Sequence, residues 1–161
     1  MGIILLMRHG KSDWEPEGVS DFNRPLSLRG IRDVLAQGQA LLRQGYRPDF
    51  ILSSPAIRAW HTAHLLAQIC SLPHEKVEPH FAFYTETLEG VTAALRSLPE
   101  TCSTVALIGH NPLWSELASR WAGKSIELST AEIVGFHWEG NWASFPAGSF
   151  PAYLFYLSRT G

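Results

Sequence analysis

The stretch Ile3–Gly10, IILLMRHG, decides the fold of this 161-residue chain. Its first five residues are all apolar, which is typical of a strand that is covered on both faces of a sheet. Arg8 and His9 follow at once, at the point where such a strand leaves the core, and Gly10 ends the stretch. We therefore expect a buried strand that delivers a cation and a titratable ring to one edge of a sheet.

Apolar segments of strand character alternate with helical periodicity along the rest of the chain. Strands are predicted at 3–7, 50–53, 77–79 and 103–109, and two adjacent β segments at 133–140 and 151–159. Apolar spacing predicts four helices, which begin near Ser27, Ser54, Leu88 and Leu113. Ser27 and Ser54 are the expected caps, with Pro55 at the first helical position. This order predicts a single α/β domain over 1–161, a mainly parallel sheet with helices on both faces.

Composition excludes several classes of protein. A formal net charge of −2 gives no basic field for nucleic acid. The apolar run at 3–7 is shorter than the about seven residues of a signal-peptide core or the roughly 20 of a membrane helix. Cys70 and Cys102 form no CxxC pattern, which fits reduced thiols. We expect a cytoplasmic protein that binds neither membrane nor nucleic acid.

Polar side chains with related chemistry follow three of the predicted strands. Arg8 and His9 come after the first strand, Arg58 after the second, and His110 after the strand at 103–109. Ligands of α/β sheets bind beyond the carboxyl ends of the strands. The sequence therefore predicts that two arginines and two histidines meet at one edge of the sheet.

This combination suits an anion with several oxygens, above all phosphate. Arginine offers a planar fork of donors for phosphate oxygens. Helix N-termini after Ser54 and Asn111 would add N–H groups and the positive end of a dipole. Nearby cations would lower the pKa of a histidine, leaving a neutral ring whose lone pair can attack phosphorus.

Four segments together resemble the signatures of the histidine phosphatase superfamily, with its phosphoglycerate mutase-like fold. They are MRHGKSDW (7–14), RPLSLRG (24–30), SSPAIRAWHTA (53–63) and LIGHNP (107–112). DFNRPLSLRG (21–30) and GHNPLWSELA (109–118) are most similar to SixA-type phosphohistidine phosphatases. The resemblance implies a three-layer α/β/α sandwich and phosphoryl transfer without a cofactor or metal.

The resemblance also implies roles for matching residues. His9 would be the nucleophile that becomes phosphorylated, Arg8 and Arg58 would clamp the phosphoryl oxygens, and His110 would donate to the phosphoryl group. Arg24 would line the same pocket, and Asn111 would bind substrate at a helix start. Gly10 would allow close backbone approach while its carbonyl orients the His9 ring.

The proton donor is where the chain departs from larger members of the family. Those members carry a glutamate on an inserted segment, whereas the corresponding stretch here, HFAFYTETLEG (80–90), has no sizeable cap insertion. Asp21, beside Arg24, is the first candidate for the acid and Glu86 the second.

The expected substrate is a phosphorylated protein carrying phosphohistidine, because an uncapped pocket is open to a partner's surface. The alternatives are a phosphatase of small phosphomonoesters and a phosphate-binding module without catalysis. His61 and His64, at i and i+3, could suggest a metal, but no carboxylate or cysteine completes a ligand set.

Overall fold

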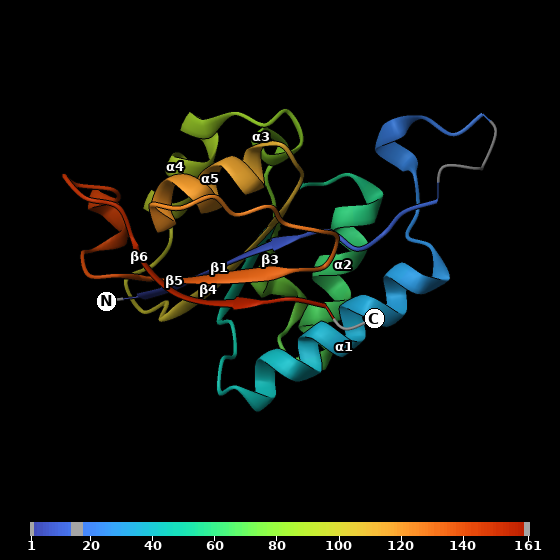
Figure 1. Cartoon of the computed structure of the whole chain (residues 1–161), viewed down its shortest axis with the longest axis horizontal. Coiled ribbons are helices and arrows are strands. Elements are labelled where there is room, and N and C mark those ends of the chain that lie inside the picture. Colours follow the sequence, from blue (N-terminus) through green and yellow to red (C-terminus); the bar gives the residue numbers. More distant parts are fainter. Residues whose placement is uncertain (1, 14–17, 160–161) are drawn as a thin grey trace.

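A six-stranded mixed sheet forms the centre of the protein (Figure 1). The computed structural model describes residues 2–13 and 18–159. The strands are β1 (Gly2–Arg8), β2 (Phe50–Ser53), β3 (Val77–Pro79), β4 (Thr104–Gly109), β5 (Ile133–Trp138) and β6 (Ala152–Leu157), in the order β3-β2-β4-β1-β5-β6. β3, β2, β4 and β1 run parallel, while β5 pairs antiparallel with both β1 and β6. The predicted strands, the mainly parallel sheet and the adjacent C-terminal β pair are confirmed.

Helices cover both faces of this sheet and make a three-layer sandwich. They are α1 (Leu28–Arg43), α2 (Ile57–Ile69), α3 (Phe81–Tyr84), α4 (Leu88–Arg96) and α5 (Leu113–Ala122), with 3-10 turns η1 (Asp21–Asn23), η2 (His74–Lys76) and η3 (Trp142–Ser144). Side chains of α1 and α2 pack on one face, and those of α4 and α5 on the other. Figure 1 shows the two helical layers below and above the strands. The predicted α/β/α architecture is confirmed.

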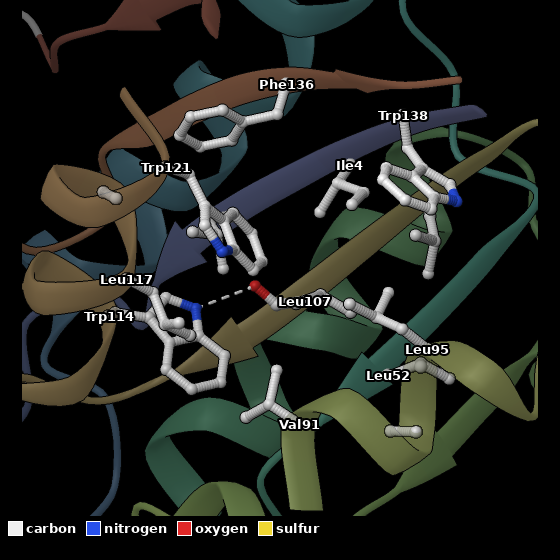
Figure 2. Packing of buried hydrophobic residues seen from close by; sticks show 14 of the residues in the cluster. Ile4, Leu52, Val91, Leu95, Leu107, Trp114, Leu117, Trp121, Phe136 and Trp138 are labelled. Carbon is white, nitrogen blue, oxygen red and sulfur yellow. Dashed lines mark hydrogen bonds between the residues drawn. The ribbon is translucent and has the colours of Figure 1, made fainter. Parts of the chain in front are cut away.

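Alternation along β1 explains why its sequence is continuously apolar. Ile4 and Leu6 point into the cluster beneath α4 and α5, whereas Leu5 and Met7 point into the cluster beneath α1 and α2. All four are at most 1 % exposed, and full burial of each contributes about 1.5–3 kcal/mol. The Trp114 indole, close to Leu117 and Trp121 in Figure 2, donates Nε1–H to the Leu107 carbonyl at 3.1 Å.

The helices predicted near Leu88 and Leu113 begin at those residues, whereas of the two predicted serine caps one is right and the other is wrong. Ser27 caps α1, because its Oγ accepts the Gly30 N–H at 3.0 Å. Ser54 is not the cap of α2, which begins at Ile57 after Ala56. The Ser54 N–H still donates to the Ile108 carbonyl at 3.0 Å, so strand-like pairing continues past the end of β2. The helix can start only after this pairing ends.

The short helix α3 has no counterpart in the sequence analysis. Its four residues are too few to show a helical period.

Over the described ranges, no helix is both long enough and apolar enough to cross a lipid bilayer.

Candidate active site

The ends of β1 and β4 bring two histidines together. Arg8 lies opposite Gly109 in the parallel register, and the His9 N–H donates to the Gly109 carbonyl at 3.1 Å. The next residue on each strand is therefore a neighbour, and the ring centroids of His9 and His110 are 5.0 Å apart. The carboxyl edge of the sheet carries the site, as predicted.

A cavity of about 480 Å³ opens at this edge. It is lined by Arg8, His9, Lys11, Ser12, Asp21, Arg24, Arg58, Tyr84, Glu86, His110, Asn111 and Thr130. Every side chain that the sequence analysis assigned to the site is in this set. Gly10 lies beneath the set and acts through its backbone.

The state of His9 is set by the residue that follows it. Its Nδ1 is 2.6 Å from the Gly10 carbonyl oxygen. A carbonyl can only accept, so Nδ1 carries the hydrogen and Nε2 keeps its lone pair in the neutral ring. Burial lowers the pKa of His9 to about 3, with smaller contributions from His110, Arg58 and Arg8. The direction of the shift was predicted, but desolvation rather than the cations is its main cause.

Gly10 is needed because the backbone passes close to α1. A Cβ at this position would lie 2.8 Å from Val34 Cγ2 and 3.0 Å from the Gly30 carbonyl oxygen. The Gly10 N–H donates to Thr62 Oγ1 at 3.1 Å, which ties this peptide to α2. Both roles predicted for Gly10, close approach and orientation of the His9 ring, match this geometry.

His110 is the second buried ring of the site. Its Nε2 is 2.8 Å from Ser54 Oγ, whereas its buried Nδ1 has no hydrogen-bond partner among the described residues. Burial lowers the pKa of His110 to about 4, and the Arg58 charge acts in the same direction. Ser54 Oγ already accepts the Ala56 N–H at 3.2 Å, and its own hydrogen is available to His110 Nε2. In that arrangement Nδ1–H is the donor that faces a ligand.

Of the two predicted phosphate clamps, Arg58 is buried and Arg8 is half-buried. Arg8 Nη1 donates to the Leu128 carbonyl at 3.1 Å, and burial lowers the pKa of Arg8. Arg58 Nη1 and Nη2 donate to the backbone oxygen and Oδ2 of Asp21, at 2.7 and 3.2 Å. The Nε of each arginine is buried without a partner in residues 2–13 and 18–159. An anion with several oxygens would satisfy such donors.

Asp21 accepts several hydrogen bonds at the mouth of the cavity. Besides Arg58, Arg24 Nε donates to Oδ1 at 3.1 Å and the Tyr84 hydroxyl donates to Oδ2 at 2.9 Å. Partial burial acts to raise the pKa of Asp21, but the Tyr84 hydrogen bond and the Arg58 charge outweigh it and lower the pKa. Asp21 is therefore a carboxylate at neutral pH.

Three further predicted residues contribute mainly by holding neighbouring segments. Glu86 Oε1 accepts the Leu113 N–H at 2.8 Å at the start of α5. Asn111 Nδ2 donates to the Leu128 carbonyl at 2.9 Å, and its Oδ1 accepts the Ser115 hydroxyl at 2.8 Å. Arg24 Nη1 donates to Ser12 Oγ at 2.6 Å, which ties the segment after β1 to the segment before α1.

Comparisons with known proteins agree with this geometry. Residues 4–82 match the model of the histidine phosphatase superfamily, branch 1. An uncharacterized chloroplastic protein of Arabidopsis thaliana is 34% identical over 90% of this chain and 73% of its own length. The chain belongs to the histidine phosphatase superfamily. An uncharacterized protein of Mycobacterium tuberculosis (strain H37Rv) is 29% identical over 95% of this chain and 100% of its own length.

Solved structures show the same superfamily fold. The protein histidine phosphatase SixA complexed with tungstate superposes with a TM-score of 0.82 at 23% identity, over 97% of this chain and 96% of that one. Phosphoserine phosphatase from Entamoeba histolytica, in complex with 3-phosphoglyceric acid, gives a TM-score of 0.64 at 15% identity, over 99% and 98%. At these identities the likeness concerns the fold alone.

Sequence reasoning missed part of this candidate site. Tyr84, Lys11, Ser12 and Thr130 line the cavity without having been singled out. Lys11 and Ser12 directly follow the RHG signature, so their position was the available signal. Tyr84 carried no such signal, because only folding places α3 beside η1.

Three of the histidines outside the site lie around a second cavity, of about 470 Å³. His61, His64 and His74 are among the residues that line it. Across the part of the chain that the structure describes, no group of three or more His, Cys, Asp or Glu side chains is placed to hold a metal ion.

Proposed function

We propose that this protein is a phosphohistidine phosphatase that works through a phosphohistidine intermediate on His9. The observation that carries the proposal is the bond from His9 Nδ1 to the Gly10 carbonyl. It leaves a neutral Nε2 at the edge of a cavity lined by Arg8, Arg58 and His110. A pure phosphate-binding module has no need of a histidine held in this tautomer.

The reaction consists of two in-line transfers. In the first, the Nε2 lone pair of His9 attacks phosphorus and the bond from phosphorus to the substrate ring breaks. The other nitrogen of that ring has already taken a proton from water, so the ring leaves with the bonding electron pair as neutral imidazole. In the second, water attacks the phosphorus on His9, loses a proton to a basic group, and releases orthophosphate and free His9. Arg8 and Arg58 balance the oxygens' charge, and His110 Nδ1–H donates to an oxygen as charge develops.

The state of Asp21 bears on the class of substrate. An ionised Asp21 has no proton to give to a leaving group in the first transfer. Phosphohistidine that solvent has protonated on its second ring nitrogen releases neutral imidazole without an acid in the site, whereas an alkyl phosphate releases an alkoxide that must be protonated. A site with this carboxylate is therefore better suited to phosphohistidine than to an alkyl phosphate. Glu86 is the alternative proton donor.

The surroundings of the cavity support a protein as the substrate. Between β3 and α4 the chain contains only the four-residue helix α3 and short connections, so we propose a single domain with no cap. A partner's own surface could then exclude water from the pocket. A phosphatase of small phosphomonoesters is the alternative.

Cys70 and Cys102 are buried free thiols, which supports our proposal of a cytoplasmic location.

Rapid quenching after mixing with labelled phosphohistidine tests the proposal. We expect one acid-labile, alkali-stable phosphate per chain, located on His9, and a loss of nearly all turnover in His9→Ala. The control is His61→Ala on α2, which should be labelled as the wild type is. Label on another residue, or substantial turnover by His9→Ala, would refute the mechanism. A panel in which a small phosphomonoester exceeds phosphohistidine about 100-fold in kcat/KM would favour the alternative.

A further inference from the structure

Exposed apolar side chains are concentrated around the mouth of the cavity. Within residues 2–13 and 18–159, the exposed large hydrophobic residues are Val19, Leu28, Ile57, Phe81, Leu88, Phe150 and Leu154. Leu28, Ile57, Phe81 and Leu88 are each the first residue of a helix, and Val19 precedes η1. Helices that follow parallel strands begin at the carboxyl edge of the sheet, where the cavity lies. We call Val19, Leu28, Ile57, Phe81 and Leu88 the apolar rim.

Phe81 is the most exposed aromatic residue of the rim, and ring contacts connect it to the active site. It is 61 % exposed, and its centroid is 5.9 Å from that of Tyr84. The Tyr84 ring makes edge contacts with Phe22 at 5.1 Å and with His110 at 5.7 Å. Ring contacts therefore run from the exposed Phe81, through Tyr84, to the buried His110.

The charges that line the cavity indicate what kind of partner surface is complementary to this part of the protein. The cavity lining contains four cations, Arg8, Lys11, Arg24 and Arg58, against the two carboxylates of Asp21 and Glu86. An anionic group is attracted to the centre, while the rim offers apolar contact and no charge. The complementary surface is an apolar patch from which one phosphorylated side chain projects. A small phosphate fills the charged centre but gains nothing from Phe81, which is not in the cavity lining.

We propose that the apolar rim is the docking surface for the protein substrate, with Phe81 as its main contact. The inference rests on the proposed function, since the phosphohistidine in the cavity fixes how the partner is oriented. Exposed aromatic residues beside a specific pocket are the type that dominates binding energy in interfaces. Apolar residues that gather at one part of a surface, unlike singly scattered ones, are typical of an interaction site.

The test compares two substrates that share their chemistry. One is free phosphohistidine, and the other is a small helical domain with a single histidine phosphorylated by phosphoramidate. We expect Phe81→Ser to lower kcat/KM about 10-fold or more for the domain, through KM, and less than about twofold for free phosphohistidine. Because Phe81 is mostly exposed, the variant should keep the wild-type melting temperature.

Phe150→Ser is the matched control. Phe150 is 55 % exposed, but the pairs Gly2–Trp138 and His137–Ala152 place its loop at the amino end of β1, away from the cavity. Figure 1 shows this orange-red loop at the opposite end of the molecule from η1. The control should hydrolyse both substrates as the wild type does.

Four results would overturn the inference. Equal losses on both substrates in Phe81→Ser would mean that Phe81 supports the site itself, and no loss on either would mean that it does not dock the substrate. A wild-type dimer that Phe81→Ser dissociates would assign the rim to a second copy of the chain. If the wild type hydrolyses neither substrate, the proposed function fails as well, which distinguishes that failure from a failure of docking alone.

Discussion

Single residues determine the chemistry of this site through very short-range contacts. The Gly10 carbonyl fixes the tautomer of His9, and Ser54 Oγ holds His110 Nε2. Both rings are at most 7 % exposed, so they stay neutral among buried guanidinium groups because the charged form is poorly solvated. As the proposed nucleophile, His9 therefore needs no separate base to deprotonate it.

The role of Asp21 gives a prediction at this scale. Because its carboxylate holds Arg58, Arg24 and Tyr84, we expect Asp21→Asn to slow all substrates about equally, by roughly tenfold. Glu86→Gln should instead slow substrates with poor leaving groups more than those with good ones. The measurement is kcat/KM across a series of aryl phosphates of graded leaving-group pKa. Leaving-group dependence in Asp21→Asn alone would make Asp21 the proton donor, as the sequence predicted.

The sequence motifs predicted which residues form the site, but they did not predict which hydrogen bonds those residues make. Arg8, His9, Arg58 and His110 could be placed from the ends of strands, since parallel strands end at the same edge. The bond between Ser54 and His110 could not be predicted, because it joins residues 56 positions apart. The Ser54 hydroxyl bonds both the Ala56 N–H and the His110 ring, and only the register of β2 with β4 brings that ring within its reach.

At the scale of elements, α1 lies directly against residues 9–11, the segment that contains His9. The Lys11 carbonyl accepts the Ser27 N–H at 2.9 Å and the Ser27 hydroxyl at 3.1 Å. A Cβ at Gly30 would lie only 2.1 Å from that same carbonyl oxygen. Because Gly30 has no side chain, α1 can approach residues 9–11 this closely.

Gly30→Ala should therefore disturb both stability and catalysis. A clash with backbone cannot be relieved by rotating a side chain, so we expect a loss of about 1–3 kcal/mol in the free energy of unfolding. kcat should fall as the Gly10 carbonyl moves away from His9 Nδ1. Urea denaturation and steady-state kinetics measure the two effects.

Gly38→Ala in the same helix is the control. Its new Cβ would meet the Ile69 side chain at 3.2 Å, and the gain in helix propensity offsets part of that contact. Normal activity in Gly30→Ala would show that the position of α1 does not govern the site.

The elements themselves were largely predictable, and the exceptions have physical causes. Continuous apolar runs identified β1, β2 and β4 because both faces of these strands are buried. The start of α2 was placed too early, since Ser-Pro resembles a helix start while Ser54 is still paired to Ile108. α3 was missed because a single helical turn has no period to detect.

At the scale of the whole molecule, folding buries cationic and titratable groups at one edge of an otherwise apolar sheet. His9, Arg24, Arg58 and His110 are all at most 9 % exposed. The free energy for desolvating them comes from the apolar layers on either side. The site is stable only while its two histidines remain neutral, which links the protein's stability to pH.

Stability should fall on acidification because of these two rings. An unfolded histidine titrates near pH 6.5, whereas the native pKa of His9 is about 3 and that of His110 about 4. Below pH 6.5 the unfolded chain binds protons that the native state does not, so stability that is present above pH 6.5 is lost as the pH falls toward 4. Between pH 7 and pH 5 the loss is about 2 kcal/mol for each histidine.

Urea denaturation at pH 7 and pH 5 measures this loss, and His9→Asn should reduce it by about half. Phe150→Ser, which removes no titratable group, is the control, and it should keep the wild-type difference between the two pH values. An unchanged pH dependence in His9→Asn would mean that His9 takes up its proton in the native state. It would then be a cation near pH 5, without the lone pair that the proposed attack on phosphorus requires.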